Sequence, residues 1–101
     1  MDANTKILYR GAASTTTTTT LYTVPASTTT VGSSIVVTNN SGSAATFTMA
    51  LGGTPLANTV TVGAYDSTVI DLKQVLDATD TITGGASVTD IHFHISGVEI
   101  A

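Results

Sequence analysis

The 101-residue sequence contains no cysteine and few charged side chains, and these absences exclude several classes of protein. Without cysteine, the chain forms neither a disulfide framework nor a thiolate metal site. Three lysine and arginine residues against seven acidic residues give a formal charge of −4. So few cations cannot neutralise a run of phosphates, and we therefore expect no nucleic-acid partner.

Long apolar runs are also missing from the sequence. No uninterrupted run approaches the roughly 18 residues that a membrane-spanning helix needs, so we expect no membrane partner. Residues 1–6 do not combine a basic region with a following apolar stretch, so no secretory signal is predicted. Because a chain this short has no disulfides, its stability must come from the core or from neighbouring subunits.

Threonine is abundant: the sequence has 22 threonine residues and a hydrophobic fraction of 42%. Because threonine is branched at Cβ, this composition favours extended structure over long helices. Short β-prone runs alternate with turn residues at intervals of about 8–12 residues, the spacing of an all-β fold. We therefore predict one all-β domain over residues 1–101, an antiparallel β-sandwich, Greek-key or jelly-roll-like, of about eight short strands.

The clearest strand covers residues 45–51, where Ala45, Phe47, Met49 and Leu51 alternate with threonines and a small residue. Before it, residues 39–43 supply asparagine, serine and glycine, and predict a hairpin or Greek-key loop. The predicted strands cover residues 5–10, 17–24, 33–39, 45–51, 60–62, 67–72, 79–83 and 88–100.

Some local patterns predict interruptions of these strands. Residues 72–76 carry apolar side chains at positions i, i+3 and i+4, which predicts one helical turn as a short crossover. Gly84 and Gly85 are expected to end the strand before them. Gly97 is expected to permit a bulge or a bend within the last strand.

The run from Thr15 to Thr20 predicts an exposed edge strand, because branched side chains make a poor flexible linker and an unpaired edge can pair with another chain. Alternatively, the run pairs only within its own sheet or forms a loop. Residues 1–20 are accordingly expected to form an exposed arm or edge strand. The residues expected to contact a neighbouring subunit are Lys6, Leu8, Arg10, Thr15, Thr16, Thr17, Thr18, Thr19 and Thr20.

Asp90, His92 and His94 alternate in the last predicted strand, which would put all three side chains on one face. Successive side chains on that face lie about 6.5–7 Å apart, and two imidazoles at this spacing can share a metal ion. A symmetric trimer could bring several copies together. With no further histidine as a third ligand, the competing interpretation is that both histidines face solvent or contact a subunit.

The sequence gives little evidence for other catalytic or ligand-binding sites. Neither a phosphate-binding glycine loop nor a GxSxG nucleophile elbow occurs, so we expect no enzymatic activity and no cofactor. Asp71, Asp77 and Asp80 suggest a loose calcium site or, alternatively, solvated turn residues. The tyrosines are too scattered in the sequence to predict an aromatic stacking platform.

Several segments carry a resemblance to a known group of proteins. The pattern YTVPA followed by VVTN.SG.AATFT resembles small β-sandwich virion proteins of tailed bacteriophages, of the marine and cyanobacterial phage type. The resemblance implies a head decoration or tail-associated subunit present in multiple copies, and no catalytic motif. The residues that carry it are 8–13, 21–26, 34–39, 41–48, 66–72, 76–82 and 95–99.

Together these features lead us to expect a capsid decoration (cement) subunit that bridges neighbouring capsid subunits at the virion surface after assembly in the host cytoplasm. The expected partners are the major capsid protein or tail proteins, together with further copies of the chain, a trimer being favoured. The alternative is a tail- or fibre-associated subunit or a host-glycan-binding module. In the glycan-binding alternative, residues 39–43 and 84–87 would carry recognition, although the scarce aromatics count against it.

Overall fold

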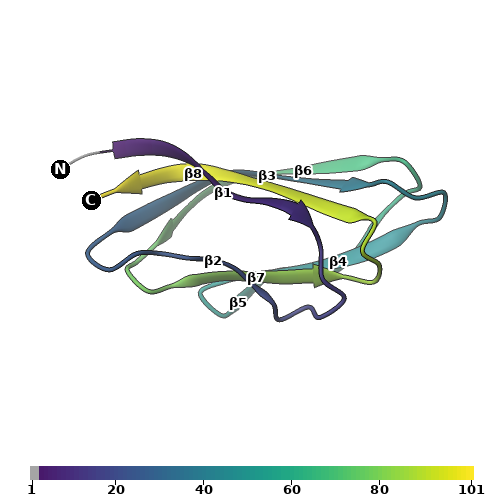
Figure 1. Cartoon of the computed structure of the whole chain (residues 1–101), viewed down its shortest axis with the longest axis horizontal. Coiled ribbons are helices and arrows are strands. Elements are labelled where there is room, and N and C mark those ends of the chain that lie inside the picture. Colours follow the sequence, from purple (N-terminus) through teal and green to yellow (C-terminus); the bar gives the residue numbers. More distant parts are fainter. Residues whose placement is uncertain (1–2) are drawn as a thin grey trace.

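The computed structural model describes residues 3–101, which form eight antiparallel strands in two four-stranded sheets packed as a sandwich (Figure 1). The predicted all-β sandwich is therefore confirmed. Within the described residues, no helix is long and apolar enough to cross a membrane. The strands are β1 (Ala3–Ala12), β2 (Thr20–Thr23), β3 (Thr29–Asn39), β4 (Ala45–Leu51), β5 (Thr54–Val62), β6 (Ser67–Leu76), β7 (Thr81–Ala86) and β8 (Ile91–Ile100).

The strand order is that of a jelly roll. One sheet has the order β1-β8-β3-β6 and the other has the order β2-β7-β4-β5. Each strand of the first half of the chain pairs with one of the second half: β1 with β8, β2 with β7, β3 with β6, and β4 with β5. The chain is thus one long folded hairpin rolled into two layers. The rolled sandwich is elongated, with extents of 46 × 21 × 18 Å.

The core lies between the two sheets and is built by alternating side chains. In β4, Phe47 and Met49 face inward as predicted, and in β8 Ile91, Phe93 and Ile95 do the same. The rings of Phe47 and Phe93 meet edge to face, with centroids 6.1 Å apart, and so join the two sheets at the centre of the sandwich.

Residues 72–76 continue strand β6, so the predicted helical turn is wrong. Strand β3 offers backbone partners along this stretch, with Val75 opposite Val31 and Leu76 opposite Thr30. Leu72 and Leu76 are buried, whereas the residues between them are exposed. The backbone pairing with β3 therefore overrides a local apolar spacing that is also compatible with a helix.

Strand β7 continues through Gly84 and Gly85, contrary to the prediction that the glycine pair ends it. A Cβ atom on Gly84 would lie 2.8 Å from the Thr48 carbonyl oxygen, and one on Gly85 would lie 2.7 Å from the Ser14 carbonyl oxygen. Because glycine has no side chain, neighbouring backbone can approach this strand closely.

The run from Thr15 to Thr20 is a loop as far as Thr19, so the exposed edge strand expected there is wrong and the alternative, a loop, is confirmed. The strand predicted over residues 17–24 begins only at Thr20. The loop lies along β7, where the Gly84 amide donates to the Thr19 carbonyl at 2.9 Å and the Ala86 amide donates to the Ser14 carbonyl at 2.9 Å. The run therefore satisfies backbone groups at the edge of β7 that would otherwise lack partners. This contact agrees with the alternative interpretation of the run, a loop or a segment that pairs only within its own sheet.

The bulge expected at Gly97 of β8 is found instead in the two strands beside it, β1 and β3. Leu8 of β1 and Ser33 of β3 are the extra residues at register shifts beside β8. A Cβ atom on Gly97 would lie 2.5 Å from the Val31 carbonyl oxygen and 3.0 Å from the Leu8 side chain. The glycine therefore lets both bulged strands close onto β8.

Candidate functional site

The outer face of the β1-β8-β3-β6 sheet carries small polar and apolar side chains with few charges. The residues that alternate with the buried ones along β8 and β3 are partly or fully exposed, as the two-residue period of a strand requires. Backbone pairing arranges this face in rows: Ile7, Ser96 and Ser34; Arg10, His94, Val36 and Val69; Ala12, His92, Thr38 and Ser67.

Strand β1 lies at one edge of this sheet and contains the predicted contact residues Lys6, Leu8 and Arg10. Lys6 and Arg10 are exposed. Leu8 is only 7% exposed and belongs to the core, so its side chain is not part of the surface. The β-bulge at Leu8 interrupts the alternation of inward and outward side chains along β1, so Ile7 points outward and is 51% exposed. Ile7 was not among the predicted contact residues.

A shallow hollow of about 360 Å³ lies beside Ile7, where the bulges of β1 and β3 flank Gly97. Its wall is apolar at Ile7 and Val98, and the ammonium group of Lys6 is paired with Glu99. We call this the β1 hollow; it is lined by Thr5, Lys6, Ile7, Ser33, Ser96, Gly97 and Val98. Its shape and apolar wall suit an apolar side chain from another polypeptide.

The predicted contact residues of the threonine run are placed differently. Thr15 to Thr18 are exposed in the loop along β7, Thr19 is half-buried, and Thr20 begins β2 at the edge of the second sheet. The Thr19 hydroxyl donates to the Thr16 carbonyl at 2.8 Å, which closes a local turn. The exposed part of this run lies in a loop beside β7 of the second sheet, whereas the β1 hollow lies on the first sheet.

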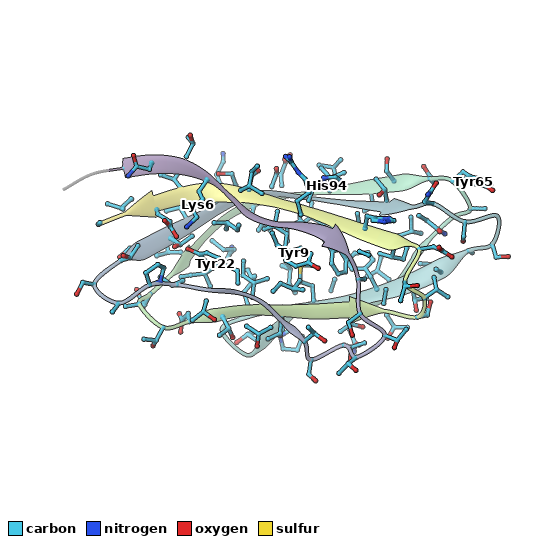
Figure 2. The ribbon with its side chains drawn as sticks, viewed as in Figure 1. Lys6, Tyr9, Tyr22, Tyr65 and His94 are labelled. Carbon is cyan, nitrogen blue, oxygen red and sulfur yellow. The ribbon has the colours of Figure 1, made fainter. Side chains whose placement is uncertain are left out.

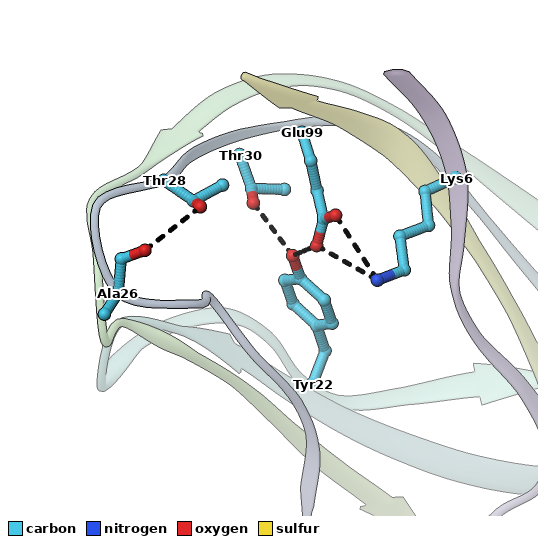
Figure 3. A network of polar contacts seen from close by, with 6 residues as sticks. All are labelled: Lys6, Tyr22, Ala26, Thr28, Thr30 and Glu99. Atoms are coloured by element: carbon cyan, nitrogen blue, oxygen red, sulfur yellow. Dashed lines mark hydrogen bonds and ion pairs between the residues drawn. The ribbon is translucent and has the colours of Figure 1, made fainter. Parts of the chain in front are cut away.

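A polar network ties the two sheets together near the chain termini (Figure 3). The Tyr22 hydroxyl of β2 donates to the Glu99 carboxylate of β8 and shares a 2.9 Å hydrogen bond with the Thr30 hydroxyl of β3. Lys6 of β1 lies 3.3 Å from the same carboxylate. The network therefore anchors the edge strand β1 beside the hollow to the second sheet.

Burial raises the pKa of the Tyr22 phenol above its ordinary value of 10.0, and the hydrogen bond to Glu99 adds to the rise. The hydrogen bond from Tyr22 lowers the pKa of Glu99 below its ordinary value of 4.5, with Lys6 acting in the same direction and burial opposing it. Each partner thus holds the other in the protonation state found near neutral pH.

We expect this network to make stability depend on pH at both extremes. Glu99 has a lowered pKa in the folded state, so its contribution is present above 4.5 and is lost as pH falls through the folded-state value. Tyr22 has a raised pKa, so its contribution is present below 10.0 and is lost as pH rises toward the folded-state value. Tyr22→Phe should weaken both changes and lower the free energy of unfolding by about 1–3 kcal/mol.

Thermal unfolding measured by circular dichroism from pH 3 to pH 11 checks this expectation. Tyr9→Phe is the matched control, because the Tyr9 hydroxyl donates to the Ala12 carbonyl at 2.8 Å and takes no part in the network. The control should keep the pH profile of the wild type. If the stability of Tyr22→Phe depends on pH in the same way as that of the wild type, the Tyr22–Glu99 hydrogen bond does not couple stability to pH.

The proposed metal ligands do not assemble as the strand alternation suggested. Asp90 lies in the turn before β8, and its backbone oxygen is 3.1 Å from Nδ1 of His92. Across residues 3–101, no three histidine or acidic side chains are grouped closely enough to hold a metal ion. Asp71, Asp77 and Asp80 were the residues considered for a calcium site. The Asp80 carboxylate accepts a 3.0 Å hydrogen bond from the Asp77 amide, as is common in turns, and Asp71 lies on the edge strand β6.

A second hollow, of about 400 Å³, lies on the outer face beside Tyr65, far from Lys6 along the molecule (Figure 2). Tyr65 is 74% exposed and has a φ of 53°, in the left-handed region that non-glycine residues seldom adopt. We call this the Tyr65 hollow; it is lined by Thr38, Asn39, Asn40, Tyr65, Asp66, Ser67, His92 and His94. Sequence reasoning singled out residues 39–43 and the two histidines for separate sites. It did not bring them together with Tyr65, because these residues come from distant parts of the chain.

Asn39, which the glycan-binding alternative placed in a recognition loop, is buried and structural. Its amide nitrogen donates to the carbonyl oxygens of Ser43, Val62 and Gly63 at 2.8–3.2 Å, and its oxygen accepts from the Ser41 amide at 3.1 Å. The asparagine thus fixes the turn that borders the Tyr65 hollow.

The described residues form an eight-stranded jelly-roll sandwich with two hollows on its surface, the β1 hollow and the Tyr65 hollow. No protein-family model matches the sequence, and comparison with curated proteins finds no match either.

Proposed function

We propose that the protein is a structural subunit of a tailed-bacteriophage virion, and specifically a capsid decoration subunit that bridges neighbouring capsid subunits. The resemblance described for the sequence supports this proposal. Jelly rolls are common in viral capsid and lectin domains, which is compatible with the proposal, although such folds host many functions. A docking role requires a surface that can pair with another polypeptide.

The single observation that carries the proposal is the exposed edge strand β1 beside the β1 hollow. This strand is ten residues long and is hydrogen-bonded to β8 on one side, so its other side can pair with another chain. Ile7 is half exposed next to an apolar wall. A partner strand could therefore gain backbone hydrogen bonds and seat an apolar side chain in the same contact.

The charge of this region fits a protein partner better than a nucleic acid. Lys6 is already paired with Glu99, and Arg10 lies opposite His94 on β8. Apart from Arg10, His92 and His94, the side chains in the paired rows of the outer face are serine, threonine and aliphatic residues. Such a surface gives close packing with a few hydrogen bonds, which is typical of a protein interface. In this proposal the partner is the major capsid protein, and further copies of the chain complete a trimer.

We expect Ile7→Asp to weaken binding to particles that were assembled without the protein by about 10-fold or more, because a carboxylate would lose its hydration in the contact. The measurement is co-sedimentation of the purified chain with such particles, with the number of bound copies counted at saturation. Val69→Asp is the matched control, since Val69 is exposed on β6, the opposite edge of the same sheet.

The proposal expects many copies per particle for the wild type and for Val69→Asp, and strongly reduced binding for Ile7→Asp. A saturation value of only a few copies would exclude decoration and favour a tail position. Equal loss for both variants would exclude β1 as the docking strand. Sedimentation of the free chain tests the trimer separately, because docking does not require association in solution.

A further inference from the structure

We propose that the Tyr65 hollow binds a neutral saccharide. This inference goes beyond docking to a capsid, because it concerns a separate site with a different class of ligand. Lys6 and Tyr65 lie toward opposite ends of the long axis (Figure 2). His92 and His94 of the hollow pair with Ala12 and Arg10 at the far end of β1. A subunit that docks through the Ile7 part of β1 would therefore leave Tyr65 free to meet a ligand in solution.

The hollow is assembled from three chain segments that backbone hydrogen bonds hold in place. The Asn39 amide donates to the Asp66 carbonyl at 2.9 Å, the Asn40 amide to the Asp90 carbonyl at 3.0 Å, and the Tyr65 amide to the Ser41 carbonyl at 3.1 Å. These bonds join the end of β3, the turn before β6 and the turn before β8. The lining is thus largely formed before any ligand arrives, which limits the entropic cost of binding.

Tyr65 provides the apolar surface that a sugar ring needs. Its ring atoms lie close to Gly42, where a Cβ atom would be 3.7 Å from the hydroxyl oxygen and 3.8 Å from a ring carbon. The side chain is nevertheless 74% exposed, so most of its surface is available for contact. Aromatic side chains of this kind offer an apolar face together with a polar hydroxyl.

The polar lining selects the class of ligand. Asp66 and Asn40 supply a carboxylate and an amide, and Thr38 and Ser67 supply hydroxyls. His92 and His94 add ring nitrogens that can donate or accept hydrogen bonds. Many hydrogen-bonding groups around one aromatic ring match a polyhydroxylated ring with an apolar face.

The charge of the residues that line the hollow disfavours an anionic ligand. Among the described residues that line the hollow, none is lysine or arginine, and Asp66 carries a negative charge. A phosphate, a sulfate or an acidic sugar would therefore meet repulsion without a fixed cation to offset it. The volume of about 400 Å³ lies within the range of small-molecule sites.

The test is a glycan array of neutral and acidic saccharides probed with the purified chain. Two-dimensional NMR titration with the free neutral sugar that binds best follows. We expect binding to neutral saccharides, with shifts of the amides of residues 38–40, 65–67 and 92–94. Tyr65→Ala should weaken binding by about 10-fold or more, because it removes the aromatic platform. Asp66→Asn should also weaken it, through loss of a strong acceptor.

Tyr9→Phe is the matched control, since Tyr9 lies on β1 outside the hollow and should leave saccharide binding unchanged. Folding of each variant is checked by its NMR spectrum without ligand. The inference is overturned if no neutral saccharide binds at millimolar concentration, if acidic sugars bind better, or if Tyr65→Ala binds like the wild type. Docking of Tyr65→Ala to particles distinguishes this result from the proposed function, because that docking should be unaffected.

Discussion

Phe93→Ala is expected to lower the free energy of unfolding by about 3–5 kcal/mol, the largest effect that we predict. Phe93 is fully buried in β8, and its ring meets the Phe47 ring of the opposite sheet edge to face. Truncation removes this contact and leaves a cavity between two sheets that cannot close without bending. Because domains of this size are stable by about 5–15 kcal/mol, a large share of the total would be lost.

Urea unfolding followed by far-ultraviolet circular dichroism measures this loss. Val69→Ala is the control, because Val69 is 61% exposed on β6 and its truncation should change stability by less than about 0.5 kcal/mol. If Phe93→Ala does not fold, Phe93→Leu keeps part of the apolar volume and should give a smaller, measurable loss. Similar midpoints for the wild type, Phe93→Leu and Val69→Ala would contradict the described core.

The second large effect is expected for Gly97→Ala, which should destabilise the protein by about 2–3 kcal/mol through overpacking. The new Cβ atom would lie 2.5 Å from the Val31 carbonyl oxygen, and backbone cannot move away as a flexible side chain can. Relief requires β8 to separate from β3 or from β1. Amide hydrogen exchange should therefore become faster in β1 and β3, beside the β1 hollow.

Gly63→Ala is the matched control for this variant. A Cβ atom on Gly63 would meet the Asp66 side chain at 3.7 Å, an ordinary van der Waals distance. The same substitution should therefore be tolerated much better there. Equal stability of Gly97→Ala and Gly63→Ala would show that the strands do not close around Gly97 as described.

The Gly97 variant also links stability to the proposed docking surface. Gly97 lines the β1 hollow, and the bulge at Leu8 turns Ile7 outward toward that hollow. If the edge strand loosens, docking to particles should weaken together with hydrogen-exchange protection in β1. The Tyr65 hollow involves other strand ends, so its saccharide binding should be less affected. The two proposed sites can thus be separated by one backbone variant.

Local features of the sequence determined the fold class and several of its elements. The alternation of Ala45, Phe47 and Met49 predicts strand β4 with its observed bounds, because the two-residue period of a strand is recorded in the sequence itself. The turn chemistry after Asn39 is equally local. An all-β sandwich follows from such patterns because every run must bury one face.

Only the tertiary structure decided which backbone each segment meets. The threonine run is a loop because Gly84 and Gly85 let it lie along β7, and residues 72–76 are a strand because β3 offers them partners. Both hollows likewise arise where residues distant in sequence are brought together. Side-chain periodicity is a property of neighbouring residues, whereas strand pairing and surface shape depend on contacts between distant ones, which the local pattern does not specify.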